Sequence, residues 1–554
     1  LPDLVFISSF FRGTTLPPLD YWLPPFKFDF YYTLQYYGAA LAGRILHMTP
    51  SLTYNLCAVF LSGMSLALVW DLASRFVPTR LPRLLLVAAI AFGGTGVSIF
   101  THIAVDAGAN QVTRGERMWG SARFIGEYDN HINTEIGHAL FPRPGALNVV
   151  PRALGMENFG YQYFLGEYHA PLGGYFLLLL ALAAMAALQG ATAKERSRKR
   201  CLQAVLGFSI PVVFATNTWM FPFQFLLIAG WALWNAWQGR KNADAKPDWI
   251  ALIGSAAVGF VLLYPFLAGF ATRAVSTPIS LVRAGDHTPV AQFLGLFWPL
   301  LVFFALGLWQ KETRRLTLFF TLIFAAFLLI SEVIYVDDPS GDQFERSNTV
   351  MKWWGWIWSG GLAALGAVLL GARARWVRVI TGVTLASTLV FAFDTVSYWW
   401  HDRERGGANL YGSNVYTSDP VTRDMFLFMN AAPYGIVLEN SYGTGYHEGG
   451  SFAAFSGKPL FVGWANQLGS WRGNMEIIGI RHEQLRKFYA GEMPNALMWL
   501  LDNEIRYVVW NRRDARAEGL WEKQNAQLMS LYAWQGFGQE NGKPIGLWVR
   551  RERQ

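Results

Sequence analysis

Three aspartates stand out in the first thirty residues of the chain: Asp3, Asp20 and Asp29. They lie among aromatic residues and prolines, directly ahead of a long series of apolar segments. A carboxylate this close to lipid is costly, and such groups most often bind a substrate or an ion or take part in catalysis. A carboxylate can act as a general base or hold a divalent metal ion. We therefore expect the chemistry of this protein to involve its first loop.

A second group of polar residues lies in the segment YVDDPSGDQFERSNTVMK, which contains Asp337, Asp338, Arg346 and Lys352. Arg346 and Lys352 are six positions apart, at the start of an apolar helix. Arginine offers a forked set of donors and lysine a point charge, so the pair could bind the phosphate of a lipid carrier.

Two more segments supply candidate residues. Glu167 and His169 lie in ENFGYQYFLGEYHAPL, and Trp471 and Arg472 lie in the C-terminal tail. The topology derived below places all these groups on one side of a membrane, where they could share a site.

Purely structural roles compete with these functional ones. Asp20, in PPLDYW, could form a turn or an Asx cap. The pair 337–338 could cap a loop before the next helix, and His169 could be an interfacial histidine with satisfied hydrogen bonds. For residues 348–349 we favour an ordinary N-cap over a ligand role.

The composition is that of a multipass membrane protein with a polar portion. Hydrophobic residues make up 53% of the 554 residues, charged residues 15%, and the mean hydropathy is +0.23. The net charge of +8 does not indicate a nucleic-acid partner, because the basic residues cluster in short loops between apolar segments. Cys57 and Cys201 lie in or beside apolar segments, which argues against a disulfide framework, and no metal-binding spacing of Cys and His is present.

Apolar segments of membrane-spanning length predict about ten transmembrane helices. They lie at 53–76, 83–103, 170–190, 202–216, 218–238, 249–270, 290–309, 314–335, 349–372 and 374–397. Basic loops such as KERSRKR (194–200) and ARARWVR (372–378) predict the cytoplasmic side. Alternation then places the loop 104–169 and everything after 398 outside the cytoplasm. The aromatic segment 28–48 is expected to lie flat in the interface, and this topology requires one further span ahead of Leu1.

The tail, 398–554, differs in kind from the preceding segments. It alternates predicted helices with predicted strands, among them GIVLEN (435–440) and RYVVWN (506–511), and ends in two strands separated by GQENGK. We therefore predict two domains. Residues 1–397 form a transmembrane domain with extracytoplasmic loops 1–48 and 104–169, and residues 398–554 form an extracytoplasmic or periplasmic α/β domain.

The order of motifs resembles the large multipass "YYY" membrane family, a domain of unknown function. The resemblance runs over nearly the whole chain and rests on five motifs in the same order. They are the first-loop segment PPLDYW with FDFYYTLQYYG, then ENFGYQYFLGEYHAPL, FATNTWMFP, RSNTVMKWW and SGKPLFVGWANQLGSWRG.

That family is in turn similar to GT-C glycosyltransferases, which take a sugar from a polyprenyl-phosphate donor on the extracytoplasmic side. The resemblance implies a GT-C-like polytopic α-helical fold with Asp3 as the catalytic base and Asp20 as a second acid. It also implies that Glu167 and His169 line the same cavity and that Arg346 and Lys352 face the lipid phosphate. Asp337, Asp338, Trp471 and Arg472 are the further expected binding residues.

The chain departs from the family pattern at ionisable positions. Pro171, Met220 and the pair Asn466–Gln467 stand where the family motifs carry His or acidic groups. The loss of these ionisable groups weakens the hypothesis of a metal site. The sequence therefore indicates no certain cofactor, and a requirement for a divalent metal ion stays an open possibility.

Two functions therefore stay open. The first is a glycosyltransferase of the bacterial or archaeal cytoplasmic membrane that meets membrane lipids and a polyprenyl-phosphate-linked sugar, and acts on an envelope glycan, lipid or protein acceptor. The second is a non-catalytic scaffold subunit that binds other membrane subunits. A transporter is less consistent with polar residues that collect at one surface.

Overall fold

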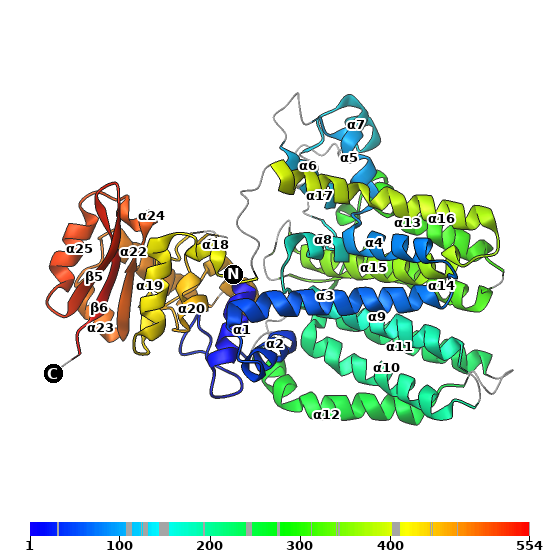
Figure 1. Ribbon diagram of the computed structural model, residues 1–554, viewed down its shortest axis with the longest axis horizontal. Coiled ribbons are helices and arrows are strands. Elements are labelled where there is room, and N and C mark those ends of the chain that lie inside the picture. Colours follow the sequence, from blue (N-terminus) through cyan, green and yellow to red (C-terminus); the bar gives the residue numbers. More distant parts are fainter. Residues whose placement is uncertain are drawn as a thin grey trace. The chain divides into compact units, whose positions relative to one another are not determined.

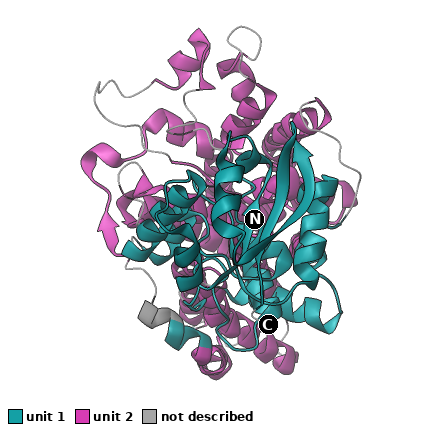
Figure 2. Cartoon of the chain, turned by 90° about the vertical axis from the view of Figure 1, so that its left-hand side faces the viewer, with its two compact units in different colours: residues 1–57, 266–275, 406–554 teal, residues 58–265, 276–405 magenta. Residues whose placement is uncertain are grey.

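The structure is a computed structural model, which describes all residues except 30–32, 107–112, 123–124, 126–130, 143–153, 192–193, 240–245, 274–276, 312, 339–340, 342–343, 402–409, 444, 446, 474 and 553–554. The chain divides into two compact units, shown in Figure 2. Unit 1 comprises Leu1–Cys57, Phe266–Val275 and Gly406–Gln554, and unit 2 comprises Ala58–Pro265 and Ser276–Arg405. This division groups the first 57 residues with the C-terminal segment, whereas the sequence analysis placed them with the membrane spans.

Unit 2 is almost entirely helical (Figure 1). Its long helices are α4 (Arg80–Phe92), α9 (Ala170–Gln189), α10 (Arg196–Thr216), α11 (Phe221–Gln238), α13 (Val290–Trp309), α14 (Arg314–Val333), α15 (Ser347–Leu370), α16 (Arg375–Thr388) and α17 (Val390–His401), together with most of α3 (Pro50–Ser74) and most of α12 (Trp249–Arg273). Its shorter elements are η1 (Gly96–Ile99), α5 (Thr101–Ala104), α6 (Arg114–Ala122), α7 (Glu135–Leu140), α8 (Phe159–Leu165), η3 (Thr218–Met220), η5 (Ala284–Asp286), β1 (Ile279–Leu281) and β2 (Ile334–Val336).

Helix α15 forms the core of unit 2. Its apolar window is buried throughout its length, and it packs against α4, α9, α13, α14 and α16. Trp354, Trp356 and Trp358 along this helix are buried. A helix that is apolar on every face and surrounded by other helices is a core helix of the bundle.

Seven helices among the described residues are long and apolar enough to cross a membrane. They are Pro50–Ser74, Ala170–Gln189, Trp249–Gly269, Val290–Trp309, Arg314–Val333, Ser347–Leu370 and Arg375–His401, and each matches a predicted span. Three of the ten predicted spans, 83–103, 202–216 and 218–238, are not among the seven. The count of ten therefore stays a prediction.

The predicted span 83–103 is not one continuous helix. α4 ends at Phe92, the backbone at Gly93 is extended, and η1 and α5 follow. A Cβ on Gly94 would lie 2.6 Å from the Cβ of Phe391, and the side chain of Asn158 donates to the carbonyls of Gly93 and Gly94. The chain therefore breaks where two glycines permit other segments to approach closely, which the hydropathy of the segment does not reveal.

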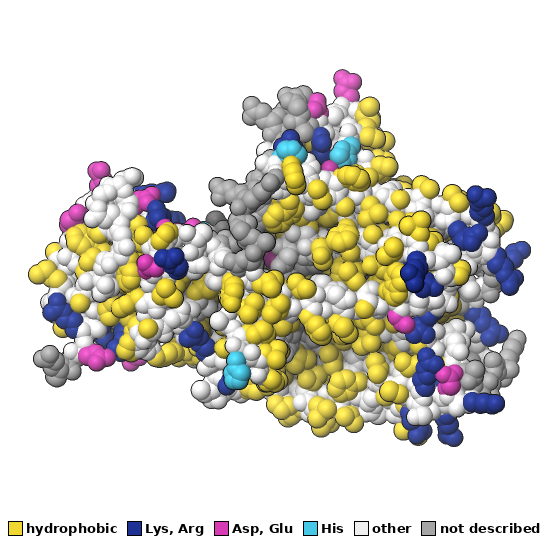
Figure 3. Space-filling view, viewed as in Figure 1, with side chains coloured by type: hydrophobic (Ala, Val, Ile, Leu, Met, Phe, Trp, Pro, Cys, Tyr) yellow, Lys and Arg dark blue, Asp and Glu magenta, His cyan; other side chains and the backbone are white. Residues whose placement is uncertain are grey.

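Basic side chains gather at one end of unit 2, at the right of Figure 3. In Figure 1 this is the end at which α3 and α15 finish and α4 and α16 begin. The connections α3–α4, α9–α10, α13–α14 and α15–α16 carry exposed basic residues. They are Arg75, Arg80, Lys194, Arg196, Arg198, Arg200, Lys311, Arg314, Arg315, Arg373, Arg375 and Arg378. The basic loops identified in the sequence thus share one end of the bundle.

Unit 1 combines helices with a four-stranded sheet of order β3-β4-β6-β5. The strands are β3 (Ile436–Leu438), β4 (Ile505–Trp510), β5 (Tyr532–Glu540) and β6 (Lys543–Arg550). β3 and β4 are parallel, whereas β6 is antiparallel to both β4 and β5. Asn541 and Gly542 connect β5 to β6, and both have positive φ, as a type I′ hairpin turn requires. The two strands predicted at the end of the chain are confirmed, with a tighter turn than expected.

The helices of unit 1 come from both ends of the chain. They are α1 (Pro2–Arg12), α2 (Leu34–Ile45), α18 (Asn414–Thr417), α19 (Pro420–Ala431), α20 (Ser451–Ser456), α21 (Ala465–Arg472), α22 (Glu476–Tyr489), α23 (Ala496–Asp502), α24 (Arg512–Ala515) and α25 (Leu520–Leu528). α1 packs against α2 and α20, and α19 also packs against α20.

The N-terminal segment enters the core of unit 1. The backbone amides of Leu460 and Gly463 donate to the carbonyls of Tyr21 and Trp22. The Trp22 side chain is 1% exposed and donates to the carbonyl of Gly450. A Cβ on Gly463 would lie 2.3 Å from the Trp22 ring, so a glycine is needed where the indole crosses the backbone. Residues far apart in sequence therefore build one hydrophobic core.

We expect Gly355→Ala to destabilise unit 2. A Cβ at this position of α15 would lie 1.9 Å from the carbonyl oxygen of Glu157 and 2.4 Å from the Tyr175 hydroxyl. Such overpacking should lower the free energy of unfolding by about 1–3 kcal/mol, measured from thermal or denaturant unfolding. The control is Gly254→Ala in α12, where nothing lies within 4 Å and stability should be kept or rise. Equal effects of the two changes would contradict this packing.

Candidate functional site

Asp20 is held by a buried ion pair with Arg472. The Nε and Nη2 atoms of Arg472 donate to Oδ2 of Asp20 at 3.0 and 2.6 Å, and the Trp22 amide donates to Oδ1 at 2.9 Å. The side chains are 4% and 7% exposed. Burial raises the pKa of the Asp20 carboxyl, and the Arg472 guanidinium and the Trp22 amide oppose that rise. The structure thus brings two predicted site residues together, in contacts that also fit the turn role considered for Asp20.

Trp471 connects this ion pair to α1. Its ring stacks on Trp22 with centroids 5.9 Å apart and packs against Phe6 with centroids 4.6 Å apart. Phe6 also contacts Tyr36 of α2, with centroids 5.1 Å apart. We call Phe6, Trp22, Tyr36 and Trp471 the aromatic cluster.

Asp3 lies at the other side of the aromatic cluster. It is the second residue of α1 and 7% exposed, and its Oδ1 accepts a hydrogen bond from the Tyr36 hydroxyl. A carboxylate in the first turn of a helix is stabilised by the helix dipole. Asp3 and the Asp20–Arg472 ion pair therefore both lie next to the aromatic cluster, to which Trp471 belongs.

Lys352 forms a buried ion pair in unit 2. Its Nζ lies 2.8 Å from Oε2 of Glu157, and the two side chains are 6% and 10% exposed. Gln162 donates to the same carboxylate at 3.3 Å, and the Tyr175 hydroxyl donates to the backbone carbonyl of Glu157. The ammonium expected to face a lipid phosphate is neutralised by a carboxylate from the segment that also carries Glu167 and His169.

Arg346 is 1% exposed and already has several acceptors. Its Nη2 donates to the carbonyl of Ser331 and to Oε1 of Glu332, both at 2.6 Å. Its Nη1 donates to the carbonyl of Asp286 at 3.0 Å and to the Thr288 hydroxyl at 3.4 Å. Removing a guanidinium from such partners is costly. This geometry argues against direct contact between Arg346 and a phosphate, so that role stays a prediction.

The two acids ahead of α15 differ from each other. Asp338 accepts a hydrogen bond from the side chain of Asn348, and its backbone amide donates to the carbonyl of Glu345. Burial raises the pKa of Asp337, and the nearby carboxylates of Glu345 and Asp338 add to the rise. α15 itself begins at Ser347 with Arg346 as its N-cap, two or three residues before the cap we favoured at 348–349.

Glu167 and His169 lie where α8 gives way to α9. Glu167 is exposed, and His169 is half-buried and forms the N-cap position of α9 without a side-chain capping bond. Among the described residues, no group of three or more His, Cys, Asp or Glu side chains could hold a metal ion. A divalent metal therefore has no proposed site here.

The sequence analysis missed a buried carboxyl, that of Glu439 just after β3. It is 2% exposed and accepts hydrogen bonds from the Ser451 hydroxyl at 3.2 Å and the Phe452 amide at 3.1 Å. Burial raises its pKa from 4.5 to about 8, which the two donors oppose. An acid at the end of an apolar strand was the signal in the sequence.

We expect Asp20→Asn to lower the free energy of unfolding of unit 1 by about 3–5 kcal/mol, because it leaves the buried Arg472 without its carboxylate. Denaturant unfolding followed by tryptophan fluorescence would measure this. The control is Asp502→Asn on the exposed end of α23, where we expect no change. If Asp20→Asn kept the stability of the wild type, the ion pair would not have the structural role described here.

We expect the stability of unit 1 to fall as pH rises from about 4.5 to about 8. The folded protein holds the Glu439 proton up to about pH 8, whereas the unfolded chain releases it near its ordinary value of 4.5. Glu439→Gln should therefore flatten the decline of the thermal midpoint over this range. Glu518→Gln, at a side chain 93% exposed, is the control. Identical pH profiles for wild type and Glu439→Gln would refute this role of Glu439.

Comparison with known proteins supplies a family and a solved structure. No curated protein matches the chain. The crystal structure of the Archaeoglobus fulgidus oligosaccharyltransferase in complex with Zn and sulfate matches with 11% identity and a TM-score of 0.40, over 99% of this chain and 68% of that one. We base no inference on a likeness of this size.

A family described as "Uncharacterized membrane protein (DUF2298)" matches residues 2–297 and 279–359. These residues include the first loop, with Asp3 and Asp20, and the segment from Asp337 to Lys352. The match covers more than half of the 554 residues. The chain therefore belongs to this family of uncharacterized membrane proteins.

Proposed function

We propose that this membrane protein is a GT-C-like glycosyltransferase that takes a sugar from a polyprenyl-phosphate donor. The acceptor would be an envelope glycan, a lipid or a protein on the extracytoplasmic side. The observation that carries the proposal is the placement of Asp3. This carboxylate is nearly buried, held by the Tyr36 hydroxyl and adjacent to the aromatic cluster.

The chemistry asks for a carboxylate that is fixed and partly shielded from water. Asp3 would accept the proton of an acceptor hydroxyl while that oxygen attacks the anomeric carbon of the donor sugar. The bond between this carbon and the phosphate oxygen would break, and the lipid phosphate would leave with the electron pair. Sugar rings present C–H faces that pack on aromatic side chains. Phe6, Trp22 and Tyr36 are buried, whereas Trp471 is partly exposed, so Trp471 is the ring of the aromatic cluster that suits a substrate beside such a base.

The remaining predicted residues have different standing in this proposal. Asp20 and Arg472 would position the aromatic cluster, since their charges neutralise each other. Glu167, His169, Asp337, Asp338 and Lys352 stay candidates for donor binding, and the contacts of Arg346 argue for a structural role. Cationic groups near a leaving phosphate would stabilise its developing charge.

We place the chain in a bacterial or archaeal cytoplasmic membrane with its basic loops in the cytoplasm. The gathering of basic residues at one end of unit 2 supports this orientation. α3 begins at Pro50 and ends at Ser74, just ahead of the basic segment 75–83. A membrane-crossing α3 therefore puts Pro50 on the extracytoplasmic side. The segment 398–554 would also lie on the extracytoplasmic side. We propose that it forms a domain separate from the transmembrane domain 1–397.

We expect Asp3→Asn to abolish sugar transfer. Membranes that contain the full chain would receive polyprenyl-phosphate donors with a radiolabelled sugar, and the label in the acceptor fraction would be counted. Loss of a general base should reduce the rate by about 10²- to 10⁴-fold. Tyr36→Phe, which removes the hydroxyl donor to Asp3, should give a smaller loss. Asp29→Asn, in the same loop, is the control and should stay active.

A folding check accompanies this test. Thermal unfolding of each purified variant would show whether Asp3→Asn still folds. A folded Asp3→Asn variant with full transfer activity would overturn the assignment of Asp3 as the base.

The alternative is a non-catalytic scaffold subunit of a membrane complex. The observation that favours it is that Arg346, Lys352 and Arg472 all pair with carboxylates of the same chain. Under this alternative, envelope glycans would be unchanged in cells that carry Asp3→Asn, and deletion of the chain would dissociate a defined complex of other membrane subunits.

A further inference from the structure

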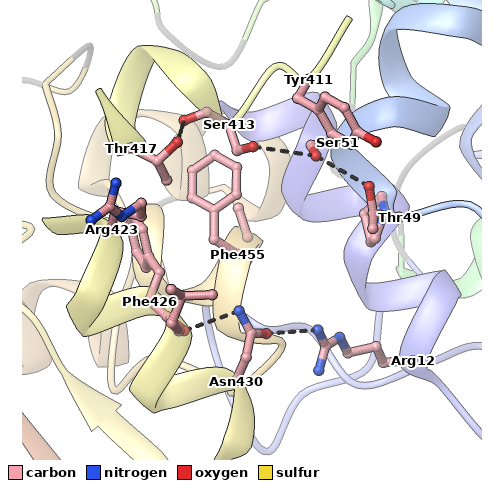
Figure 4. A pocket seen from close by; sticks show the side chains of 13 residues that line it. Arg12, Thr49, Ser51, Tyr411, Ser413, Thr417, Arg423, Phe426, Asn430 and Phe455 are labelled. Carbon is pink, nitrogen blue, oxygen red and sulfur yellow. Dashed lines mark hydrogen bonds between the residues drawn. The ribbon is translucent and has the colours of Figure 1, made fainter. Parts of the chain in front are cut away.

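Unit 1 contains an open cavity of about 390 Å³ that none of the assignments above uses. Its size falls within the range of small-molecule sites. Figure 4 shows the Phe455 ring near its centre, hydroxyl groups along one rim, and Arg12 and Arg423 on different sides. Among the residues that the structure describes, the lining includes two arginines and no carboxylate.

Five elements of unit 1 build this cavity: α1, α3, α18, α19 and α20. α19 contributes Arg423, Phe426 and Asn430, which lie on one face because their spacing follows the helical repeat. α20 contributes Phe455, and the start of α3 contributes Thr49 and Ser51. Arg12 comes from the end of α1, which is fixed to α20 by a hydrogen bond from the Ser8 hydroxyl to the carbonyl of Ala454 at 2.8 Å.

The two arginines keep donors for a ligand. Arg12 donates from Nη2 to the side-chain oxygen of Asn430 at 3.1 Å. Its guanidinium carries five N–H donors. Arg423 donates to the adjacent Asp424 at 3.0 Å, and both side chains are 52% exposed. An exposed pair of this kind contributes little energy, so a ligand could displace it.

The backbone also fixes the position of Arg12. A Cβ on Gly457, whose φ is +62°, would lie 2.1 Å from Cδ and Nε of Arg12. The arginine side chain therefore lies directly against a glycine, and a larger residue there would move it. The positive charge of Arg12 also acts on Lys458, whose pKa is lowered to about 8 by burial first and by repulsion from Arg12 and Arg506.

One rim of the cavity carries hydroxyl groups and the N-terminus of α3, and Phe426 and Phe455 form its apolar floor. The hydroxyls of Thr49 and Ser51 are 3.4 Å apart, and Ser413 reaches Ser51 at 3.5 Å. The N-terminus of the 25-residue helix α3 adds a positive partial charge at the same rim. On the floor, Phe426 and Phe455 pack with centroids 5.1 Å apart.

We propose that this cavity binds the phosphate group of an amphiphilic ligand, with the phosphate between Arg12 and Arg423 and an apolar portion on Phe426 and Phe455. Arginine forks and hydroxyl donors match the several oxygens of a phosphate. The aromatic floor gives an amphiphile an advantage over a free phosphate ion. This inference does not rest on the proposed glycosyltransferase activity.

Binding would be measured by isothermal titration calorimetry on the purified full chain in a non-ionic detergent. The probes are dihexanoylphosphatidic acid, inorganic phosphate, and dihexanoylphosphatidylcholine as a zwitterionic control. We expect saturable binding of the phosphatidic acid, and weaker binding of the other two probes. If inorganic phosphate bound as tightly as the phosphatidic acid, or if no probe gave saturable binding, the proposal would be overturned.

Matched variants test the residues. Arg12→Gln and Arg423→Gln should each raise the Kd for the phosphatidic acid about tenfold. The loss of one hydrogen bond to a charged group raises a Kd by about that factor or more. Gly457→Ala keeps both charges and should also weaken binding, because it displaces Arg12. Arg551→Gln removes the same charge from an exposed position outside the cavity and should leave the Kd unchanged.

The variants also separate a site from general charge effects. Arg12 and Arg423 are exposed, so their replacement should not alter thermal unfolding. Equal weakening by Arg551→Gln, or an unchanged Kd in both cavity arginine variants, would show that the ligand does not bind here.

Discussion

The insertion of Trp22 and its neighbours into unit 1 is the constraint on which the rest of this unit depends. The indole crosses the backbone at Gly463, and the carbonyls of Tyr21 and Trp22 accept hydrogen bonds from the amides of Leu460 and Gly463. The Asp20–Arg472 ion pair closes the same junction. These contacts join residues more than 400 positions apart, so the position of α1 depends on the C-terminal segment. Asp3 and Arg12, at the two ends of α1, depend on this junction for their positions.

Unit 2 is organised around a different constraint, the burial of α15. A helix enclosed on all sides in an apolar bundle must neutralise any charge that it carries. Lys352 does so with Glu157, and Arg346, at the start of the helix, does so with Glu332 and backbone carbonyls. Because Gly355 has no side chain, the backbone of Glu157 can approach α15 closely enough for the Lys352–Glu157 ion pair to form. The charges that look available in the sequence are therefore part of the packing.

These two constraints separate the charged residues by what they can do. The Asp3 carboxylate accepts a hydrogen bond from a neutral group, the Tyr36 hydroxyl, and is the proposed general base. Arg12 and Arg423 line an open cavity and face acceptors that a phosphate could replace. Arg346, Lys352 and Arg472 are buried against carboxylates, where a substrate would have to compete with a short ion pair. A basic residue at a helix entrance is thus not by itself evidence for phosphate binding.

The sequence by itself determined the features that depend on local pattern. Hydropathy and length predicted the seven helices that could cross a membrane, and two apolar runs on either side of the turn residues GQENGK predicted the closing strands. Basic loops predicted a common end of the bundle. The tertiary structure decided which charged side chains form buried ion pairs and which are exposed to a ligand, because burial and pairing depend on segments distant in sequence. It also decided the break at Gly93, the pairing of residues 21–22 with 460–463, and the cavity between α1 and α19, since close backbone approach leaves no local signal other than a glycine.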